Sequence, residues 1–223
     1  KIIQQREVFK GSLSTSIVHS REVFKMAIKN KVVIITGASS GIGKATALLL
    51  AESGAKVVLA ARNQEKLEKV VNEIKERNGE AVYKVTDVSK REEVKSLIDF
   101  TISKYGKIDV IFNNAGLMPN SPLSEFRTDE WDEMIDVNLK GVVNGIEAVL
   151  PHFIEQKSGH VISTSSVAGL NTYLGAGIYC ATKHGVKALM EVLRKESANE
   201  KRNIRTTTLY LGAFKTELAE RIT

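Results

Sequence analysis

Residues 31–43, KVVIITGASSGIG, constrain the fold of this chain more than any other stretch. The β-branched run 32–35 is typical of a strand buried on both faces of a parallel sheet. A glycine-rich turn follows the run, and residues 44–50 favour a helix. In such a unit the glycines allow a sharp turn and a close ligand, while the free N–H groups of the helix start attract an anion. The stretch therefore predicts a phosphate-binding turn.

The spacing of this turn narrows its interpretation. Its glycines follow the pattern Gly-x3-Gly-x-Gly, which differs from the commoner G-x-G-x-x-G fingerprint of dinucleotide binding. A Walker A loop is excluded, because Ala45 stands where a Ser or Thr must bind magnesium. We expect the nucleotide to contact Gly37, Ser39, Ser40, Gly41, Ile42 and Gly43.

Buried strands alternate with amphipathic helices along the rest of the chain. We expect further strands at 56–61, 81–85, 108–112, 159–164 and 204–210, and helices that include 64–78, 94–102, 128–156 and 176–199. This alternation predicts a doubly wound α/β fold, in which a parallel sheet is covered on both faces by helices. Ligands of such sheets bind at the carboxyl ends of the strands.

Composition excludes several other classes of protein. With 223 residues and 43% hydrophobic residues, the chain is long enough for one sizeable core. No apolar run is long enough to span a membrane, and no basic stripe with interleaved aromatic residues suggests nucleic-acid binding. The single cysteine, Cys180, excludes a disulfide framework and fits a cytoplasmic location. No paired Cys and His spacing predicts a metal site.

The first 25 residues differ from the rest. The pentapeptide REVFK occurs at 6–10 and again at 21–25, on either side of a Ser-rich spacer, and this segment carries half of the net charge of +6. It lacks the apolar core of a secretory signal. We interpret 1–25 as an extraneous or poorly ordered leader, with a short docking element as the alternative, and 26–223 as one domain.

The end of the second strand predicts which nucleotide is bound. Dinucleotide folds usually carry an acidic residue there, which binds the adenosine ribose. In this chain Arg62 occupies the region and the acid is missing, which favours NADP(H) over NAD(H) because a guanidinium suits a 2′-phosphate. A solvated charge near a helix start is the alternative for Arg62. Asp87 either accepts from the adenine amino group or caps the following turn.

Three side chains are the candidates for catalysis. Tyr179 and Lys183 are four residues apart in a helical sequence, so phenol and ammonium share one face. A nearby ammonium lowers the pKa of a phenol from its usual value of about 10, which suits a general acid that protonates a carbonyl oxygen. Ser166, at the end of a strand, would hold the same oxygen. The alternatives are a surface Tyr/Lys pair and a polar strand end.

From Met26 onward the chain resembles the single-domain short-chain dehydrogenases/reductases, which have a Rossmann fold. Five features agree in order and spacing: the glycine turn, Asn113-Asn114-Ala115-Gly116, Asn138, Ser166 and Tyr179-x3-Lys183. The resemblance implies that Tyr179 is the acid/base and that Ser166 positions the substrate carbonyl. It also implies that Lys183 lowers the pKa of Tyr179 and binds the nicotinamide ribose, and that Asn138 holds a relay water.

The resemblance assigns further residues to the cofactor cleft. Asn114, Ala115 and Gly116 line it, while Gly212 and Thr216 belong to the segment that wraps the nicotinamide carboxamide. Two departures from the family pattern stand out. Leu211-Gly212 replaces the usual Pro-Gly pair, and the chain stops at Thr223, before the family's usual last strand. We therefore expect six strands and a form truncated at its C-terminus.

The sequence as a whole predicts an NADP(H)-dependent oxidoreductase that interconverts a carbonyl and an alcohol in a small molecule. The resemblance implies a homodimer or homotetramer in the cytoplasm. The pocket is expected to be mainly apolar, with the lining Leu117, Met118, Leu170, Tyr173 and Leu174. Two alternatives are a non-catalytic NADP-binding protein of the same fold and an epimerase or dehydratase, which would need a larger substrate domain.

Overall fold

The computed structural model describes residues 26–212. The proposed leader 1–25 and residues 213–223 lie outside this range, so the expectations for the leader and for Thr216 concern residues that are not described. Nothing in the described range tests the division of the chain at residue 26.

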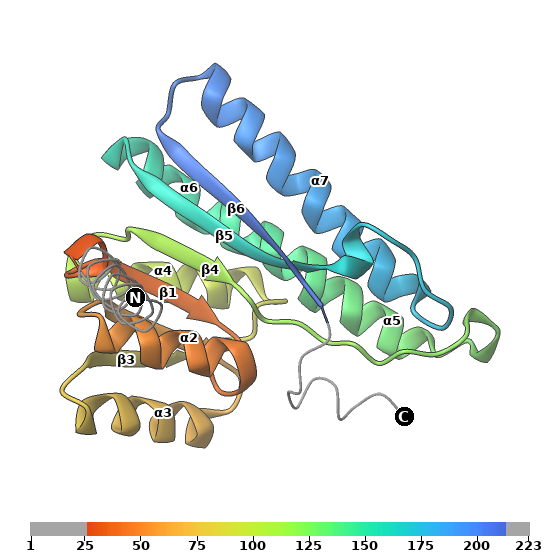
Figure 1. Cartoon of the computed structure of the whole chain (residues 1–223), viewed down its shortest axis with the longest axis horizontal. Coiled ribbons are helices and arrows are strands. Elements are labelled where there is room, and N and C mark those ends of the chain that lie inside the picture. The colour runs from red at the N-terminus through yellow and green to blue at the C-terminus, as the bar shows by residue number, and fades with distance from the viewer. Residues whose placement is uncertain (1–25, 213–223) are drawn as a thin grey trace, which may run out of the picture.

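Six parallel strands form one sheet in the order β3-β2-β1-β4-β5-β6 (Figure 1). The order reverses between β1 and β4, which places a switch point at the carboxyl ends of these two strands. The strands are β1 Val32–Thr36, β2 Lys56–Ala61, β3 Glu80–Val85, β4 Val110–Asn113, β5 Gly159–Ser166 and β6 Ile204–Leu211. The predicted doubly wound α/β fold is confirmed.

Helices cover both faces of this sheet. They are α2 Gly41–Glu52, α3 Gln64–Glu76, α4 Arg91–Tyr105, α5 Thr128–Ile135, α6 Gly141–Gln156 and α7 Gly177–Asn199. Side chains alternate between faces along a strand, so neighbours in β1 join different cores. Val33 belongs to the cluster that contains residues of α2 and α3, whereas Ile34 belongs to the cluster with α4, α6 and α7. Figure 1 shows α7 running alongside β5 and β6.

The long helical region expected at 128–156 is interrupted. A π-helical turn, η2 Asp136–Lys140, separates α5 from α6, and the Gly141 N–H bonds to the Asp136 carbonyl. Gly141 allows this turn to pack closely, because a Cβ there would lie 2.8 Å from a methyl carbon of Val88. Two short 3-10 turns, η1 Leu123–Glu125 and η3 Val167–Gly169, lie in the loops after β4 and β5. The π turn reshapes the helix next to the carboxyl ends of the strands.

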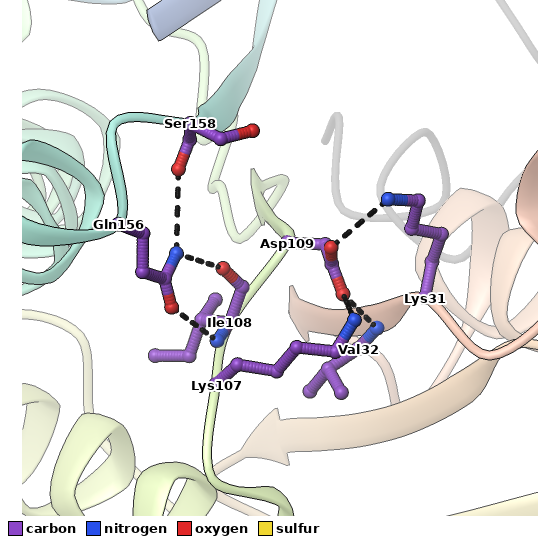
Figure 2. Close-up of polar contacts among 7 residues, drawn as sticks. All are labelled: Lys31, Val32, Lys107, Ile108, Asp109, Gln156 and Ser158. Atoms are coloured by element: carbon purple, nitrogen blue, oxygen red, sulfur yellow. Dashed lines mark hydrogen bonds and ion pairs between the residues drawn. The ribbon is translucent and has the colours of Figure 1, made fainter.

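The Asp109 carboxylate connects β1 and β4 at the amino end of the sheet (Figure 2). Asp109, just before β4, accepts a hydrogen bond of 2.8 Å from the Val32 N–H. It also pairs with Lys31 at 3.1 Å and with Lys107 at 2.9 Å. Burial alone would raise the pKa of Asp109, but the Val32 N–H and the two lysines outweigh it and lower the pKa. The carboxylate therefore links β1 to β4 in its ionised form.

An amide makes a second link at the same end (Figure 2). The Gln156 side chain, at the end of α6, donates to the Ile108 carbonyl at 2.8 Å and accepts from the Ile108 N–H at 3.3 Å. It also donates to the Ser158 carbonyl at 3.3 Å. This arrangement satisfies backbone groups that precede β4 and β5, and it fixes the end of α6 against the sheet.

Candidate active site

The glycine turn between β1 and α2 leaves no room for side chains at two positions. Gly37 has a φ of +64°, and a Cβ there would lie 2.9 Å from the Ala115 Cα. A Cβ on Gly43 would lie 2.3 Å from the Gly37 carbonyl oxygen. Gly41 also has a positive φ, of 51°. The backbone therefore packs here as closely as a phosphate-binding turn requires.

The first turn of α2 carries no side-chain cap. Ser40 is the N-cap residue, with extended backbone, but its hydroxyl makes no capping bond, and the first turn holds no acidic residue. By contrast, α3 begins with a capping Asn63 side chain and Glu65 in its first turn. Ser39 and Ile42 flank the same turn, half-buried. This helix start therefore offers uncompensated N–H groups to an anion.

The segment after β4 is hydrogen-bonded to the end of β1. The Thr36 hydroxyl accepts from the N–H groups of Asn114 at 3.0 Å and Ala115 at 3.1 Å. The Asn114 amide donates to the Thr36 carbonyl at 3.1 Å and accepts from the Thr164 hydroxyl at 3.3 Å. Asn114 thus joins the carboxyl ends of β1, β4 and β5. Thr36 is the first residue of the glycine motif in the sequence, but the motif alone assigned it no role in the site.

Asn138 is buried in the π turn, and its side chain makes three hydrogen bonds. Its Oδ1 accepts from the Leu117 N–H at 2.7 Å. Its Nδ2 donates to the Leu117 carbonyl at 2.8 Å and to the Thr182 hydroxyl at 3.3 Å. A Cβ on Gly116 would lie 3.2 Å from the Asn138 Oδ1, so Gly116 passes directly beside it. The Asn138 side chain therefore links the segment after β4 to α7.

Tyr179, Lys183 and Ser166 meet where β5 and α7 come together. Lys183 is only 4% exposed, and its ammonium donates to the Thr164 carbonyl at 2.9 Å. The same nitrogen lies 5.6 Å from the centre of the Tyr179 ring. The Ser166 hydroxyl accepts from the Ala168 N–H at 3.1 Å and donates to the Leu211 carbonyl at 3.3 Å. The three predicted catalytic side chains are thus brought together.

The electrostatics of this group differ from the sequence-based expectation. Burial raises the pKa of Tyr179, and the opposing influence comes from a hydrogen bond with Ser166 rather than from Lys183. Burial lowers the pKa of Lys183 to about 8. The expected lowering of the phenol pKa by the ammonium is therefore absent. The reason is that burial disfavours charge on both groups, while the ammonium proton is directed at the Thr164 carbonyl.

Arg62 lies just after β2, as the sequence indicated, but it has an unexpected partner. Its Nη1 lies 3.2 Å from a carboxylate oxygen of Glu133 in α5, and the two side chains are 54% and 49% exposed. Asp87 accepts from the N–H of Ser89 at 2.9 Å and from its hydroxyl at 2.8 Å. That geometry matches the turn-capping alternative, which does not exclude an adenine contact.

The remaining predicted residues are spread around the site. Gly212 is the last described residue, and a Cβ there would meet open space. Of the expected pocket residues, Leu117 is buried and Met118 is half-buried, while three are exposed: Leu170, Tyr173 and Leu174. Cys180 is a free buried thiol. Within residues 26–212, no group of His, Cys, Asp and Glu could hold a metal ion, and no helix is long and apolar enough to cross a membrane.

The fold and site define a doubly wound α/β protein with a Ser, Tyr and Lys group where β5 ends beside α7. Residues 31–223 match the short chain dehydrogenase family, so the chain belongs to that family. An uncharacterized oxidoreductase of Listeria monocytogenes is 66% identical over 198 residues, which are 89% of this chain and 80% of the relative. Another, from Staphylococcus saprophyticus, is 51% identical over 195 residues, 87% of this chain and 78% of the relative. The protein is thus an oxidoreductase.

Solved structures of the family are also similar. A short chain dehydrogenase/reductase from Burkholderia phymatum in complex with NAD has a TM-score of 0.85 and 33% identity, covering 87% of this chain and 69% of that one. An alcohol dehydrogenase from Thermococcus sibiricus complexed with 5-hydroxy-NADP has a TM-score of 0.81 and 34% identity, covering 87% of this chain and 81% of that one. These neighbours therefore include complexes with either kind of nucleotide.

Proposed function

We propose that this protein is an NADP(H)-dependent oxidoreductase that interconverts a carbonyl group and an alcohol in a small molecule. The observation that carries the proposal is the meeting of Ser166, Tyr179 and Lys183 at the carboxyl end of the sheet. These groups lie beside the Asn114 to Gly116 segment, which is bonded to the strand that leads into the glycine turn.

The residues present fit a nicotinamide dinucleotide. The start of α2 has no side-chain cap and no acidic residue in its first turn, which suits a pyrophosphate, and glycine at 37 and 43 lets the turn pack closely against the segment after β4. Lys183, next to Gly116, is placed to bind a ribose hydroxyl. When bound, the nicotinamide supplies or accepts the hydride.

The side chains supply proton transfer and orientation. The Tyr179 phenol is protonated at neutral pH, so it would donate a proton to a carbonyl oxygen, but its raised pKa makes it a weaker acid in the ligand-free protein than the sequence predicted. Ser166, which interacts with the same phenol, would hold that oxygen in place. Lys183, with a pKa of about 8, stays mainly protonated at pH 7, so its ammonium would be available to donate a hydrogen bond to the nicotinamide ribose. The backbone of Asn138 would hold the water that returns the proton.

Tyr179→Phe tests this role. The change removes the proton donor and keeps the ring, so we expect turnover of carbonyl compounds to fall by about 100-fold to 10,000-fold while the Kd for NADPH stays within about twofold. Loss of NADPH absorbance with a panel of aldehydes and ketones measures the first quantity, and fluorescence titration the second. A variant that keeps a tenth or more of the wild-type rate contradicts the assignment. Binding of NADPH without turnover of any compound by the wild-type protein favours a non-catalytic binding protein.

Arg62 supports the choice of NADP(H). It directly follows the second strand, the end of that strand carries no acidic residue of its own, and the Arg62 side chain is half exposed and accessible. Arg62→Ala removes the guanidinium, so we expect the Kd for NADPH to rise at least tenfold while the Kd for NADH changes little. Titration of the variant with both nucleotides measures this. An unchanged ratio of the two Kd values contradicts the NADP(H) preference.

The proposal also covers the working form of the enzyme. We propose a single catalytic domain over 26–223 that acts in the cytoplasm as a homodimer or homotetramer. The free, buried Cys180 supports a reducing compartment.

A further inference from the structure

The ion pair between Arg62 and Glu133 joins two parts of the nucleotide-facing end that are 71 residues apart in sequence. Arg62 follows β2, and Glu133 belongs to α5. The Nη1 of Arg62 is 3.2 Å from the Glu133 carboxylate. Both side chains are about half exposed, so water and ligands reach the pair. The Arg62 guanidinium, which we propose to bind the 2′-phosphate, therefore already has an anionic partner in Glu133.

A guanidinium has five N–H donors in a fixed plane and binds an anion best through two parallel hydrogen bonds. While Glu133 occupies the Nη1 of Arg62, one of those donors is directed at a carboxylate. A phosphate group that binds the other donors brings a charge of nearly −2 close to the Glu133 charge. The like charges repel each other, and repulsion over a few ångströms near a protein surface changes binding severalfold.

We propose that Glu133 sets the nucleotide preference of this enzyme by competing with the 2′-phosphate of NADP(H) for Arg62. This inference rests on the proposed NADP(H)-dependent function. NAD(H) carries a hydroxyl in place of the phosphate, so its binding does not require Arg62 to leave Glu133. The carboxylate therefore weakens NADP(H) binding and leaves NAD(H) binding unchanged, which narrows the preference that Arg62 creates.

A positioning role for Glu133 would have the opposite effect. If the carboxylate mainly held the guanidinium in place for the phosphate, its removal would weaken NADP(H) binding. Exposed ion pairs restrain their side chains only weakly, and Arg62 and Glu133 are half exposed. The phosphate also forms stronger, bidentate hydrogen bonds that orient the guanidinium by themselves. Competition therefore outweighs positioning.

Glu133→Gln, which keeps the shape and removes the charge, tests the proposal. Titrations with NADPH and with NADH give the Kd values for the wild-type protein and the variant. We expect the Kd for NADPH to fall about fivefold and the Kd for NADH to stay within about 1.5-fold. Asp132→Asn is the matched control, because it removes one exposed carboxylate from the neighbouring position of α5 and should move neither Kd. An unchanged or higher Kd for NADPH in Glu133→Gln overturns the proposal.

A second pair of titrations tests whether Arg62 mediates the effect. The same substitution is made in the Arg62→Ala background, where competition for the guanidinium no longer exists, and the gain in NADPH affinity should disappear. An equal gain in both backgrounds overturns the coupling through Arg62. Failure of the proposed function gives a different result, because Arg62→Ala alone would then leave the Kd for NADPH unchanged. If Arg62→Ala weakens NADPH binding and Glu133→Gln has no effect, only the role of Glu133 is wrong.

Discussion

At the amino end of the sheet, the Asp109 carboxylate is held by one backbone N–H and two lysines, whereas at the carboxyl end the buried Lys183 ammonium donates to the single Thr164 carbonyl. The two groups respond to their surroundings in opposite ways. The pKa of Asp109 is lowered, which means that folding favours its charged form. The pKa of Lys183 is lowered to about 8, which means that folding disfavours its charged form.

The two charged groups therefore contribute to the free energy of folding with opposite signs. The polar groups at the amino end are partnered and partly hydrated, so they favour the folded state. At the carboxyl end a cation is buried with few partners, which costs free energy of folding unless a function requires it. The ligand-free protein thus has a stabilising carboxylate at the amino end and a destabilising ammonium at the carboxyl end, and the ammonium belongs to the proposed catalytic group.

Replacement of Lys183 by Met should give the larger change in stability. The drop in pKa from 10.5 to about 8 corresponds to roughly 3 kcal/mol against folding at pH 7, of which about 1 kcal/mol is offset when the Thr164 carbonyl loses its donor. We therefore expect Lys183→Met to raise the free energy of unfolding of the ligand-free protein by about 2 kcal/mol and to abolish turnover. Urea denaturation at pH 7 measures the first effect.

The stability difference between Lys183→Met and the wild type should depend on pH in a defined direction. Between pH 8 and 10.5 the unfolded state binds the Lys183 proton and the folded state does not, so wild-type stability gains from rising pH in this window. The advantage of Lys183→Met should accordingly shrink as pH rises from 8 to 10.5. Lys187→Met, one turn further along α7 and exposed, is the control and should change stability by less than about 0.5 kcal/mol. A Lys183→Met protein less stable than wild type would refute the contrast.

A smaller effect of the opposite sign is expected at the amino end. Asp109→Asn removes the charge that attracts Lys31 and Lys107, each 47% exposed, so we expect a loss of about 1 kcal/mol at pH 7 with activity unchanged. The lowered pKa means that the contribution of Asp109 is present above its unfolded pKa and disappears as pH falls through the folded value. Thermal unfolding of wild type and variant at neutral and acidic pH measures both points.

A second exposed carboxylate, Asp99, provides a control for Asp109→Asn. Asp99→Asn removes an exposed charge from α4 and should change the melting temperature little at any pH. If Asp109→Asn destabilises the protein equally at pH 7 and in acid, its effect comes from packing, and the electrostatic account of the amino end fails.

Much of the fold was predictable because its signals are local. Apolar runs rich in β-branched residues indicated all six strands, and their alternation with helical stripes indicated the doubly wound sheet. The start of the fourth strand was predicted two residues too early: residues 108 and 109 precede β4, since the backbone of Ile108 pairs with Gln156 rather than with a strand. The π turn at 136–140 was also missed, because helix periodicity differs little around one inserted residue.

The sequence predicted which residues form the candidate site, but not how their surroundings affect their protonation. The motif spacing selected Ser166, Tyr179 and Lys183, and the structure brings them together. Their protonation behaviour was not predictable, because it depends on burial and on bonds to groups far along the chain. The partner of Arg62 was hidden for the same reason, since nothing in the local sequence of Glu133 indicates a contact across 71 residues.

The double hydrogen bond between Asn138 and Leu117 has a consequence for reading kinetic data. The side-chain amide of Asn138 both donates to and accepts from the backbone of Leu117, as a paired β-strand would. The same amide also donates to the Thr182 hydroxyl in α7. Truncation of Asn138 would release the loop after β4 from the helix that carries Tyr179. A slow Asn138 variant would therefore report a misplaced scaffold as much as a broken proton path, and the two causes separate only by comparing its structure with its rate.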